Sequence, residues 1–82
     1  MNEPMKRHEN RFFVDAIPYE TEETALTGAQ IKARASIPPQ YQLFLEEEGD
    51  RPDRAISDGE SVNLQGEPKH FFAVPPATFG LR

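Results

Sequence analysis

The stretch LTGAQI at residues 26–31 decides the fold, because it marks the start of one short helix. Thr27 and Gln30 have the spacing of a capping box, in which each side chain satisfies a backbone N–H that the first helical turn leaves free. Leu26 and Ile31 flank the box as a hydrophobic staple. The helix must end before Pro38, because the residue that precedes a proline avoids the α region. The sequence therefore predicts a helix over 28–36, which needs packing against a sheet to be stable.

Extended segments lie on both sides of this helix. A hairpin precedes it, with strands over 12–14 and 19–21 and a turn over 15–18, in which Pro18 is acceptable only near a sheet edge or a strand start. Strands over 41–45, 54–56, 62–64 and 70–74 follow it, separated by turns rich in glycine, proline and acidic residues. One helix crossing between a hairpin and later strands predicts an α+β fold, with a mixed sheet of four to five strands. The first and last strands should be parallel neighbours in the middle of the sheet, which is the β-grasp arrangement.

The expected core follows from the two-residue period of strands and the turn of the helix. Its members are Ala29, Ile31, Ala35, Tyr41, Leu43, Leu45, Val62, Phe71 and either Phe12 or Phe13.

The same alternation places Phe44, His70 and Phe72 on the opposite face of the sheet, on neighbouring strands. Exposed aromatic side chains that cluster in this way typically mark an interaction surface. The alternative is that the register is shifted by one residue, which would bury Phe72 instead.

Composition excludes several classes of function. With 82 residues the chain is one domain at most, and it has no cysteine for a disulfide, a thiolate metal site or a cysteine nucleophile. The net charge of −5 argues against nucleic-acid binding, which depends on cationic contacts to phosphate. No apolar run has membrane-spanning length, and we expect a cytoplasmic protein that does not bind a membrane.

Metal binding and catalysis find little support in the residues. His8 and His70 lie far apart in the sequence. Acidic residues crowd one stretch, namely Glu46, Glu47, Glu48, Asp50, Asp53 and Asp58. Their spacing does not match a calcium loop, which favours a solvated loop, although metal-bridged contacts between copies stay open. Asp58, Ser61 and His70 supply the residue types of a catalytic triad but no nucleophile elbow, and we therefore expect neither an enzyme nor a cofactor.

Six runs of the sequence resemble the bacterial multiubiquitin family of ubiquitin-like domains. They are FFVD (12–15), LTGAQIKA (26–33), IPP (37–39), LFLE (43–46), ISDGESV (56–62) and FFAVPPATFG (71–80). The resemblance covers about residues 11–80 and implies a ubiquitin-like β-grasp domain over 11–76. A disordered tail over 1–10 would precede the domain and a flexible tail over 77–82 would follow it. Many family members carry several such domains in tandem, while Met1 and the short tail favour a single-domain member here.

The resemblance implies a protein modifier with partners similar to E1 activating enzymes, E2 conjugating enzymes and deubiquitinase-like peptidases, together with a target protein. Ubiquitin ends in two glycines, whereas this chain has one tail glycine, Gly80, followed by Leu81 and Arg82. A peptidase would remove Leu81 and Arg82 and leave the Gly80 carboxylate for conjugation. Glycine suits a narrow activating cleft because it lacks Cβ. We also expect Phe44, His70, Phe72 and Phe79 to bind partners.

Two other functions compete with conjugation. A β-grasp domain can serve as a non-covalent assembly or adaptor module that associates with itself or with partner proteins, because a fold does not determine a function. A sulfur carrier uses the same fold with a C-terminal thiocarboxylate, but such carriers typically end in two glycines, which this tail lacks.

Overall fold

The computed structural model describes residues 9–77, which form seven strands and one helix. In chain order the elements are β1 (Asn10–Val14), β2 (Ile17–Thr21), β3 (Ala25–Thr27), α1 (Gly28–Arg34), β4 (Gln42–Leu45), β5 (Arg54–Ile56), β6 (Ser61–Asn63) and β7 (Lys69–Val74). The tail expected over the first residues and the end of the C-terminal tail, residues 1–8 and 78–82, lie outside this range.

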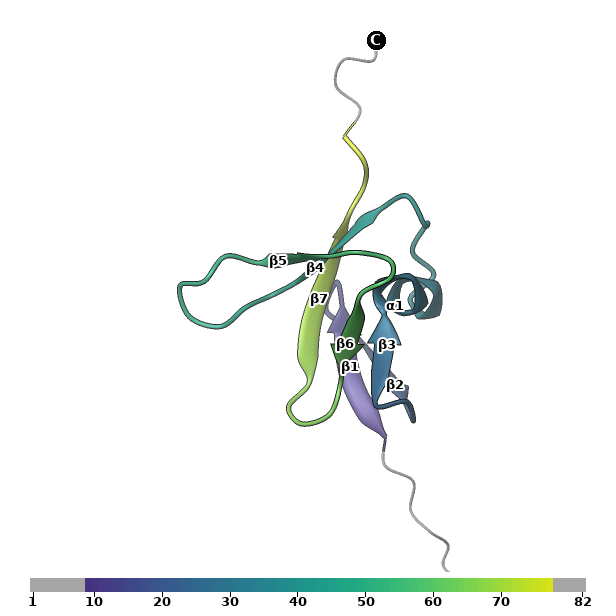
Figure 1. Ribbon diagram of the computed structural model, residues 1–82, viewed down its shortest axis with the longest axis vertical. Coiled ribbons are helices and arrows are strands. Elements are labelled where there is room, and N and C mark those ends of the chain that lie inside the picture. The colour runs from purple at the N-terminus through teal and green to yellow at the C-terminus, as the bar shows by residue number, and fades with distance from the viewer. Residues whose placement is uncertain (1–8, 78–82) are drawn as a thin grey trace, which may run out of the picture.

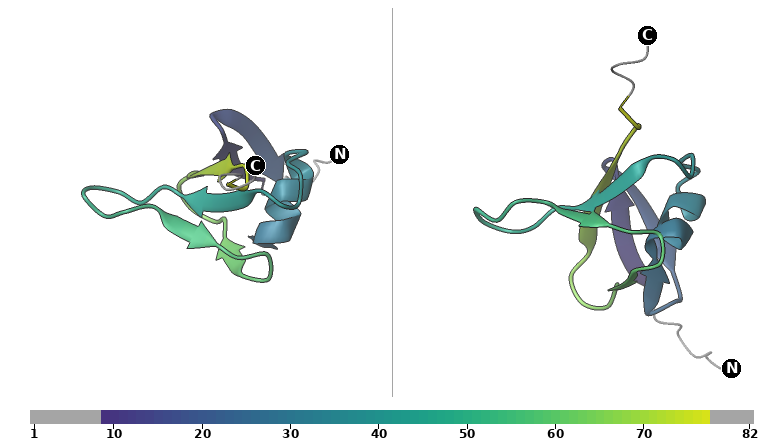
Figure 2. Two further views of the ribbon diagram at one scale, coloured as in Figure 1. Left: turned by 90° about the horizontal axis from the view of Figure 1, so that it is seen from above. Right: turned by 45° about the horizontal axis from the view of Figure 1, so that its top comes forward.

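Five strands form a mixed sheet in the order β2-β1-β7-β4-β5 (Figure 1). β1 and β7 are parallel neighbours, with Val14 beside Phe71, and the other pairs of this sheet are antiparallel. The helix and a two-stranded ribbon of β3 and β6 pack on one face of the sheet (Figure 2). The predicted ubiquitin-like β-grasp fold with one crossing helix is therefore confirmed.

The first hairpin is tighter than predicted. β1 and β2 are joined by only two residues, Asp15 and Ala16, which both have positive φ, at 54° and 70°. This left-handed pair matches the right-handed twist of hairpin strands. Pro18 lies inside β2, which is an edge strand, so its missing N–H removes no bond that the sheet needs.

The helix begins as predicted and ends two residues early. Gln30 donates its backbone N–H to the Thr27 hydroxyl at 3.2 Å, and the Thr27 N–H donates to the Gln30 side chain at 2.9 Å, which completes the capping box. Helical geometry stops at Arg34 because Ser36 adopts φ 58° and Ile37 donates its N–H to the Lys32 carbonyl at 2.9 Å. This bond is the main closing contact of a Schellman motif.

β3 was not predicted. Its three residues directly precede the helix and pair with β6, from Ala25 beside Asn63 to Thr27 beside Ser61. The helix is also bonded to the turn between β5 and β6, because Gly28 and Ala29 donate their N–H groups to the carbonyls of Glu60 and Asp58 at 3.0 and 3.1 Å. A three-residue strand has no usable periodicity, and its partner lies far along the chain.

One apolar core lies between the sheet and the layer formed by the helix and the ribbon. Its buried members are Phe12, Val14, Leu26, Ile31, Leu43, Leu45, Ile56, Val62, Leu64 and Phe71. Most of these residues were expected, and the choice between Phe12 and Phe13 falls on Phe12. Two expectations were wrong: Tyr41 is only half-buried because it precedes β4, and Ala29 is exposed. Ala29 lies one helical turn before the exposed Ala33, whereas Ile31 and Ala35 face inward.

Lys32 is a buried charge that joins the helix to two loops. Only 5% of the residue is exposed, and its ammonium lies 2.8 Å from a carboxylate oxygen of Asp58. The same group donates to the carbonyls of Pro39 at 2.7 Å and Tyr41 at 2.8 Å. All three N–H donors of the ammonium therefore have an acceptor, which a buried lysine requires.

Candidate functional site

The outer face of the five-stranded sheet, opposite the core, carries rings on its three central strands. Phe13 on β1, His70 and Phe72 on β7, and Phe44 on β4 alternate with the buried residues of the same strands. We call these four residues the outer aromatic face. Their positions follow from the two-residue period of the strands, because the neighbouring residues point into the core.

The four rings form two stacked pairs. Phe44 lies beside Phe72 in the antiparallel register of β4 and β7, with ring centroids 5.2 Å apart and planes inclined by 11°. Phe13 lies beside His70 in the parallel register of β1 and β7, with centroids 4.6 Å apart and planes inclined by 2°. Stacked pairs of this kind contribute about 0.5 to 1.5 kcal/mol beyond the area that they bury.

The structure brings together three of the four side chains expected to bind partners. Phe44 and Phe72 are half-buried by their own stacking, while His70 is exposed. Phe79, the fourth, lies outside the described residues. Phe13 was not singled out from the sequence, because its place beside His70 depends on the offset between two parallel strands that are distant in the chain.

Small apolar residues extend this face toward both edges of the sheet. Pro18 of β2 is exposed and lies beside Phe13, and Ala55 of β5 is exposed and lies beside Phe44. An ion pair closes one end, where Arg11 donates to Glu20 at 2.7 Å and lowers the pKa of that carboxyl. An apolar centre with a charged rim is the usual composition of a protein-binding surface.

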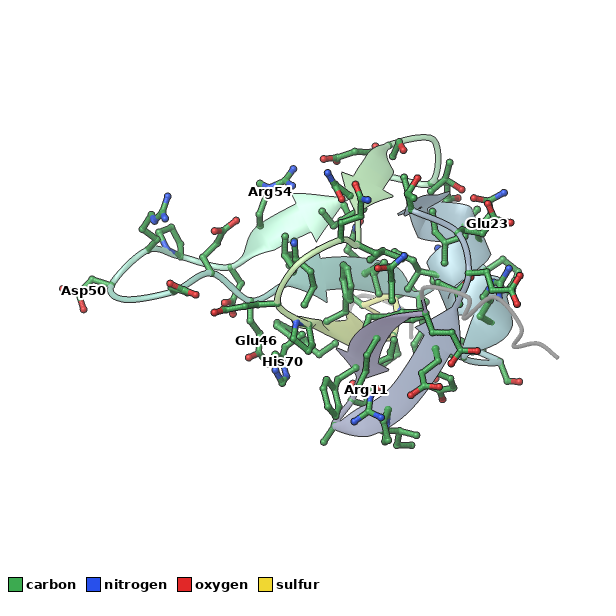
Figure 3. The ribbon with its side chains drawn as sticks, turned by 90° about the horizontal axis from the view of Figure 1, so that it is seen from below. Arg11, Glu23, Glu46, Asp50, Arg54 and His70 are labelled. Carbon is green, nitrogen blue, oxygen red and sulfur yellow. The ribbon has the colours of Figure 1, made fainter. Side chains whose placement is uncertain are left out.

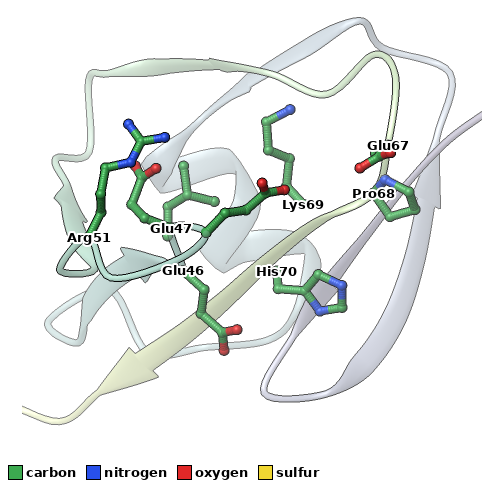
Figure 4. Close-up of a pocket in the computed structure, with 9 residues that line it drawn as sticks. Glu46, Glu47, Arg51, Glu67, Pro68, Lys69 and His70 are labelled. Atoms are coloured by element: carbon green, nitrogen blue, oxygen red, sulfur yellow. The ribbon is translucent and has the colours of Figure 1, made fainter.

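A polar cavity of about 340 Å³ opens beside the start of β7 (Figure 4). Its lining is formed by Leu45, Glu46, Glu47, Glu48, Arg51, Glu67, Pro68, Lys69 and His70. Figure 3 shows Glu46 and His70 on the same side of the molecule, with Asp50 at the tip of the 46–53 loop. Charges of both signs line this cavity, and only His70 belongs to the outer aromatic face as well.

The acidic stretch is divided between several local contacts. Asp58 pairs with the buried Lys32, and Arg54 contacts both Glu47, at 3.6 Å, and Glu60. The hydrogen bond from Arg54 lowers the pKa of the Glu60 carboxyl. Within residues 9–77, no three acidic, histidine or cysteine side chains gather closely enough to hold a metal ion. Asp58 and His70 have the residue types of a catalytic triad, but Asp58 pairs with Lys32 and His70 stacks on Phe13.

The last strand leads directly to the tail. β7 lies at the centre of the sheet between β1 and β4, and Pro75, Pro76 and Ala77 follow it as exposed residues without regular structure. Gly80, Leu81 and Arg82, expected to be the conjugation and processing residues, lie outside the described range. Also within residues 9–77, no helix has the length and apolar character needed to cross a membrane.

Comparison with known proteins identifies a family whose model matches this chain. The model of the multiubiquitin family matches residues 10–77, from the first residue of β1 to the exposed segment after β7. No curated protein and no solved structure matches the chain. Because the match includes every strand and the helix of the β-grasp fold, the chain belongs to the multiubiquitin family.

Proposed function

We propose that the chain is a ubiquitin-like protein modifier, attached to a target protein through the carboxylate of Gly80. An E1-like enzyme would activate this carboxylate and an E2-like enzyme would transfer it, after a deubiquitinase-like peptidase has removed Leu81 and Arg82. The domain itself would perform no catalysis and need no cofactor. Because activation of this type consumes ATP, the protein would act in the cytoplasm.

The placement of β7 carries this proposal. The strand is held on both sides by β1 and β4, and its last residue is followed at once by Pro75 and Pro76. Prolines favour an extended polyproline II backbone, which limits the conformations open to the chain directly after β7. A tail restricted in this way loses less entropy when it enters a narrow cleft. The absence of Cβ in Gly80 suits such a cleft as well.

The outer aromatic face would hold the activating and conjugating partners while the tail reacts. Truncating an aromatic residue at the centre of an interface typically costs more binding energy than truncating its neighbours. Phe44 and Phe72, which are stacked and half-buried in the free chain, are therefore the expected anchors.

The second candidate is a non-covalent assembly or adaptor module. The outer aromatic face favours it, because two stacked ring pairs on the sheet face opposite the core can bind a partner or a second copy without any tail chemistry. The two functions differ in their need for Gly80, since an adaptor would work equally well with an altered tail.

ATP–pyrophosphate exchange with the E1-like enzyme from the same genome separates these functions. We expect exchange with the parent chain cut after Gly80, no exchange with Gly80→Val, and weaker binding but a reactive carboxylate with Phe44→Ala. Valine adds a branched side chain where the cleft must close on the backbone. Equal exchange for Gly80→Val and the parent would exclude Gly80 as the reactive residue. No exchange for the parent would leave the adaptor as the better description.

A further inference from the structure

The two neighbours of β7 support it over different lengths. β1 pairs with β7 only from Lys69 to Phe71, because β1 ends at Val14 and the chain then reverses into β2. On the other side, β4 pairs with β7 up to Val74, which lies beside Gln42. The last part of β7 therefore has a backbone partner on the β4 side and none from the strand β1 itself.

Asp15 fills the missing place on the β1 side. Its backbone N–H donates to the Phe71 carbonyl at 2.9 Å, which extends the ladder by one residue into the turn. Its side-chain oxygen then accepts the N–H of Ala73 at 3.2 Å. The Asp15 carboxylate at the hairpin turn thus supplies the hydrogen bond that a further residue of β1 would otherwise make with β7.

Ala73 is the last residue that can be held in this way. Backbone N–H groups of a strand point alternately to its two sides, so Ala73 faces β1, Val74 faces β4, and the next group facing β1 would belong to Pro75. Proline has no N–H. The bond from Ala73 to Asp15 is therefore the last one that a backbone N–H of β7 donates on the β1 side.

The position places two demands on its residue. It must tolerate φ 54°, which is costly for most side chains, and it must carry an acceptor that reaches two residues along β7. Aspartate and asparagine meet both demands, because they enter the left-handed region more readily than other residues and have a short side-chain oxygen.

We propose that Asp15 is a positioning residue for the C-terminal tail. It fixes the end of β7 by accepting the Ala73 N–H at the point where the tail begins, and we call this hydrogen bond the clamp. The inference rests on the proposed function, because it assigns to the clamp the task of presenting Gly80 to the activating enzyme. With the clamp closed, Val74 and the two prolines leave the sheet in one direction. With the clamp open, the end of β7 is attached to β4 alone and the tail samples more directions.

Three variants isolate the clamp from the turn that carries it. Asp15→Gly keeps the left-handed backbone and removes the acceptor. Asp15→Asn keeps both, and Ala16→Gly changes the neighbouring turn residue without touching the acceptor. Amide hydrogen exchange in the ¹⁵N-labelled full chain should be about tenfold faster at Ala73 in Asp15→Gly, as expected for one lost hydrogen bond. Exchange at Ala73 should remain near the parent rate in Asp15→Asn and Ala16→Gly, and exchange at Leu43 should remain unchanged in all three.

The same variants, cut after Gly80, are then compared as substrates of the E1-like enzyme with ATP. We expect KM to rise about three- to tenfold for Asp15→Gly with kcat unchanged, because the tail must be ordered on binding. Asp15→Asn should restore the parent KM. Equal exchange at Ala73 in Asp15→Gly and Asp15→Asn would show that no clamp exists, and faster exchange with an unchanged KM would show that the clamp does not position the tail.

If the proposed function is wrong, the experiment gives a different result. The E1-like enzyme then does not activate the parent chain, and the positioning role of Asp15 is excluded together with the proposed function. Exchange at Ala73 is measured on the free chain and decides independently whether Asp15 holds the end of β7.

Discussion

Replacing Gly28 by alanine reverses the effect expected from helix propensity. Gly28 is the first residue of α1, and alanine is favoured over glycine in a helix by about 1 kcal/mol. In this structure, however, a Cβ on Gly28 would lie 2.3 Å from the Ser57 carbonyl oxygen and 3.2 Å from a methyl carbon of Ile56. The first distance is far inside contact range, and it involves backbone that cannot rotate away.

The expected loss of unfolding free energy follows from the groups that a Cβ on Gly28 would displace. Shifting the turn after β5 would break the two hydrogen bonds from Gly28 and Ala29 to that turn, at about 1 kcal/mol each. Overpacking adds about 1 to 3 kcal/mol, and the propensity gain offsets about 1 kcal/mol. The net loss is about 2 to 4 kcal/mol, a large part of the roughly 5 to 15 kcal/mol typical of proteins.

Urea unfolding followed by far-UV circular dichroism measures this loss. With a slope of about 1 kcal/mol per molar, the midpoint of Gly28→Ala should fall by at least about 2 M. Gly59→Ala is the matched control in the same turn, because a Cβ there meets nothing within 4 Å. Its stability should stay within about 1 kcal/mol of the parent. A Gly28→Ala midpoint equal to or above that of the parent would refute the close packing of α1 on the turn.

Three further predictions concern the core, the outer aromatic face and one ion pair. Leu43→Ala should cost about 2 to 5 kcal/mol of unfolding free energy in the same urea assay, because Leu43 is fully buried, and an unchanged midpoint would contradict its place in the core. Phe44→Ala should cost about 1 to 3 kcal/mol through the lost stacking and partial burial of its ring, yet calorimetry should show at least about tenfold weaker binding to an E1-like or E2-like partner; equal affinity would remove Phe44 from the interface. The pKa of Glu60 is lowered below its ordinary 4.5 by Arg54, so its stabilising effect is present above that pH and lost as pH falls through the lowered value. Glu60→Gln should therefore lose less stability than the parent in thermal melts between pH 7 and pH 3, and parallel losses would contradict the pairing.

The sequence predicted those features that depend on neighbouring residues. The capping box of Thr27 and Gln30 lies within four residues, and the two-residue period of β4 places Leu43 and Phe44 on opposite faces of the sheet. The order of the elements then permits few topologies, which is why the parallel pairing of the first and last strands could be predicted.

The features that the sequence did not predict depend on contacts between distant residues. Ala16 adopts φ 70° although it is neither glycine nor asparagine, the residues that usually mark a two-residue turn, so the predicted hairpin turn was too long. The stacking of Phe13 on His70 requires the offset of two parallel strands. The clamp from Asp15 to Ala73 spans 58 residues and depends on the same offset. No pattern within one segment contains such information.

Half-burial of Phe44 and Phe72 corrects one expectation of the sequence. Both rings were expected to lie on the outer face as exposed side chains. Because the two rings cover each other, their removal carries a stability cost in addition to any effect on binding. Stability and affinity must therefore be measured separately for variants of this face.

Intact-mass spectrometry of the full chain tests the proposed function most directly. The chain is incubated with the E1-like, E2-like and peptidase proteins of the same genome and ATP, beside a Gly80→Val variant. We predict that the parent loses Leu81 and Arg82 and then gains an adduct whose fragment spectrum joins the Gly80 carbonyl to an amine of the target, while Gly80→Val forms none. An adduct that retains Arg82 would contradict the assignment of Gly80, and the absence of any adduct would contradict the modifier function itself.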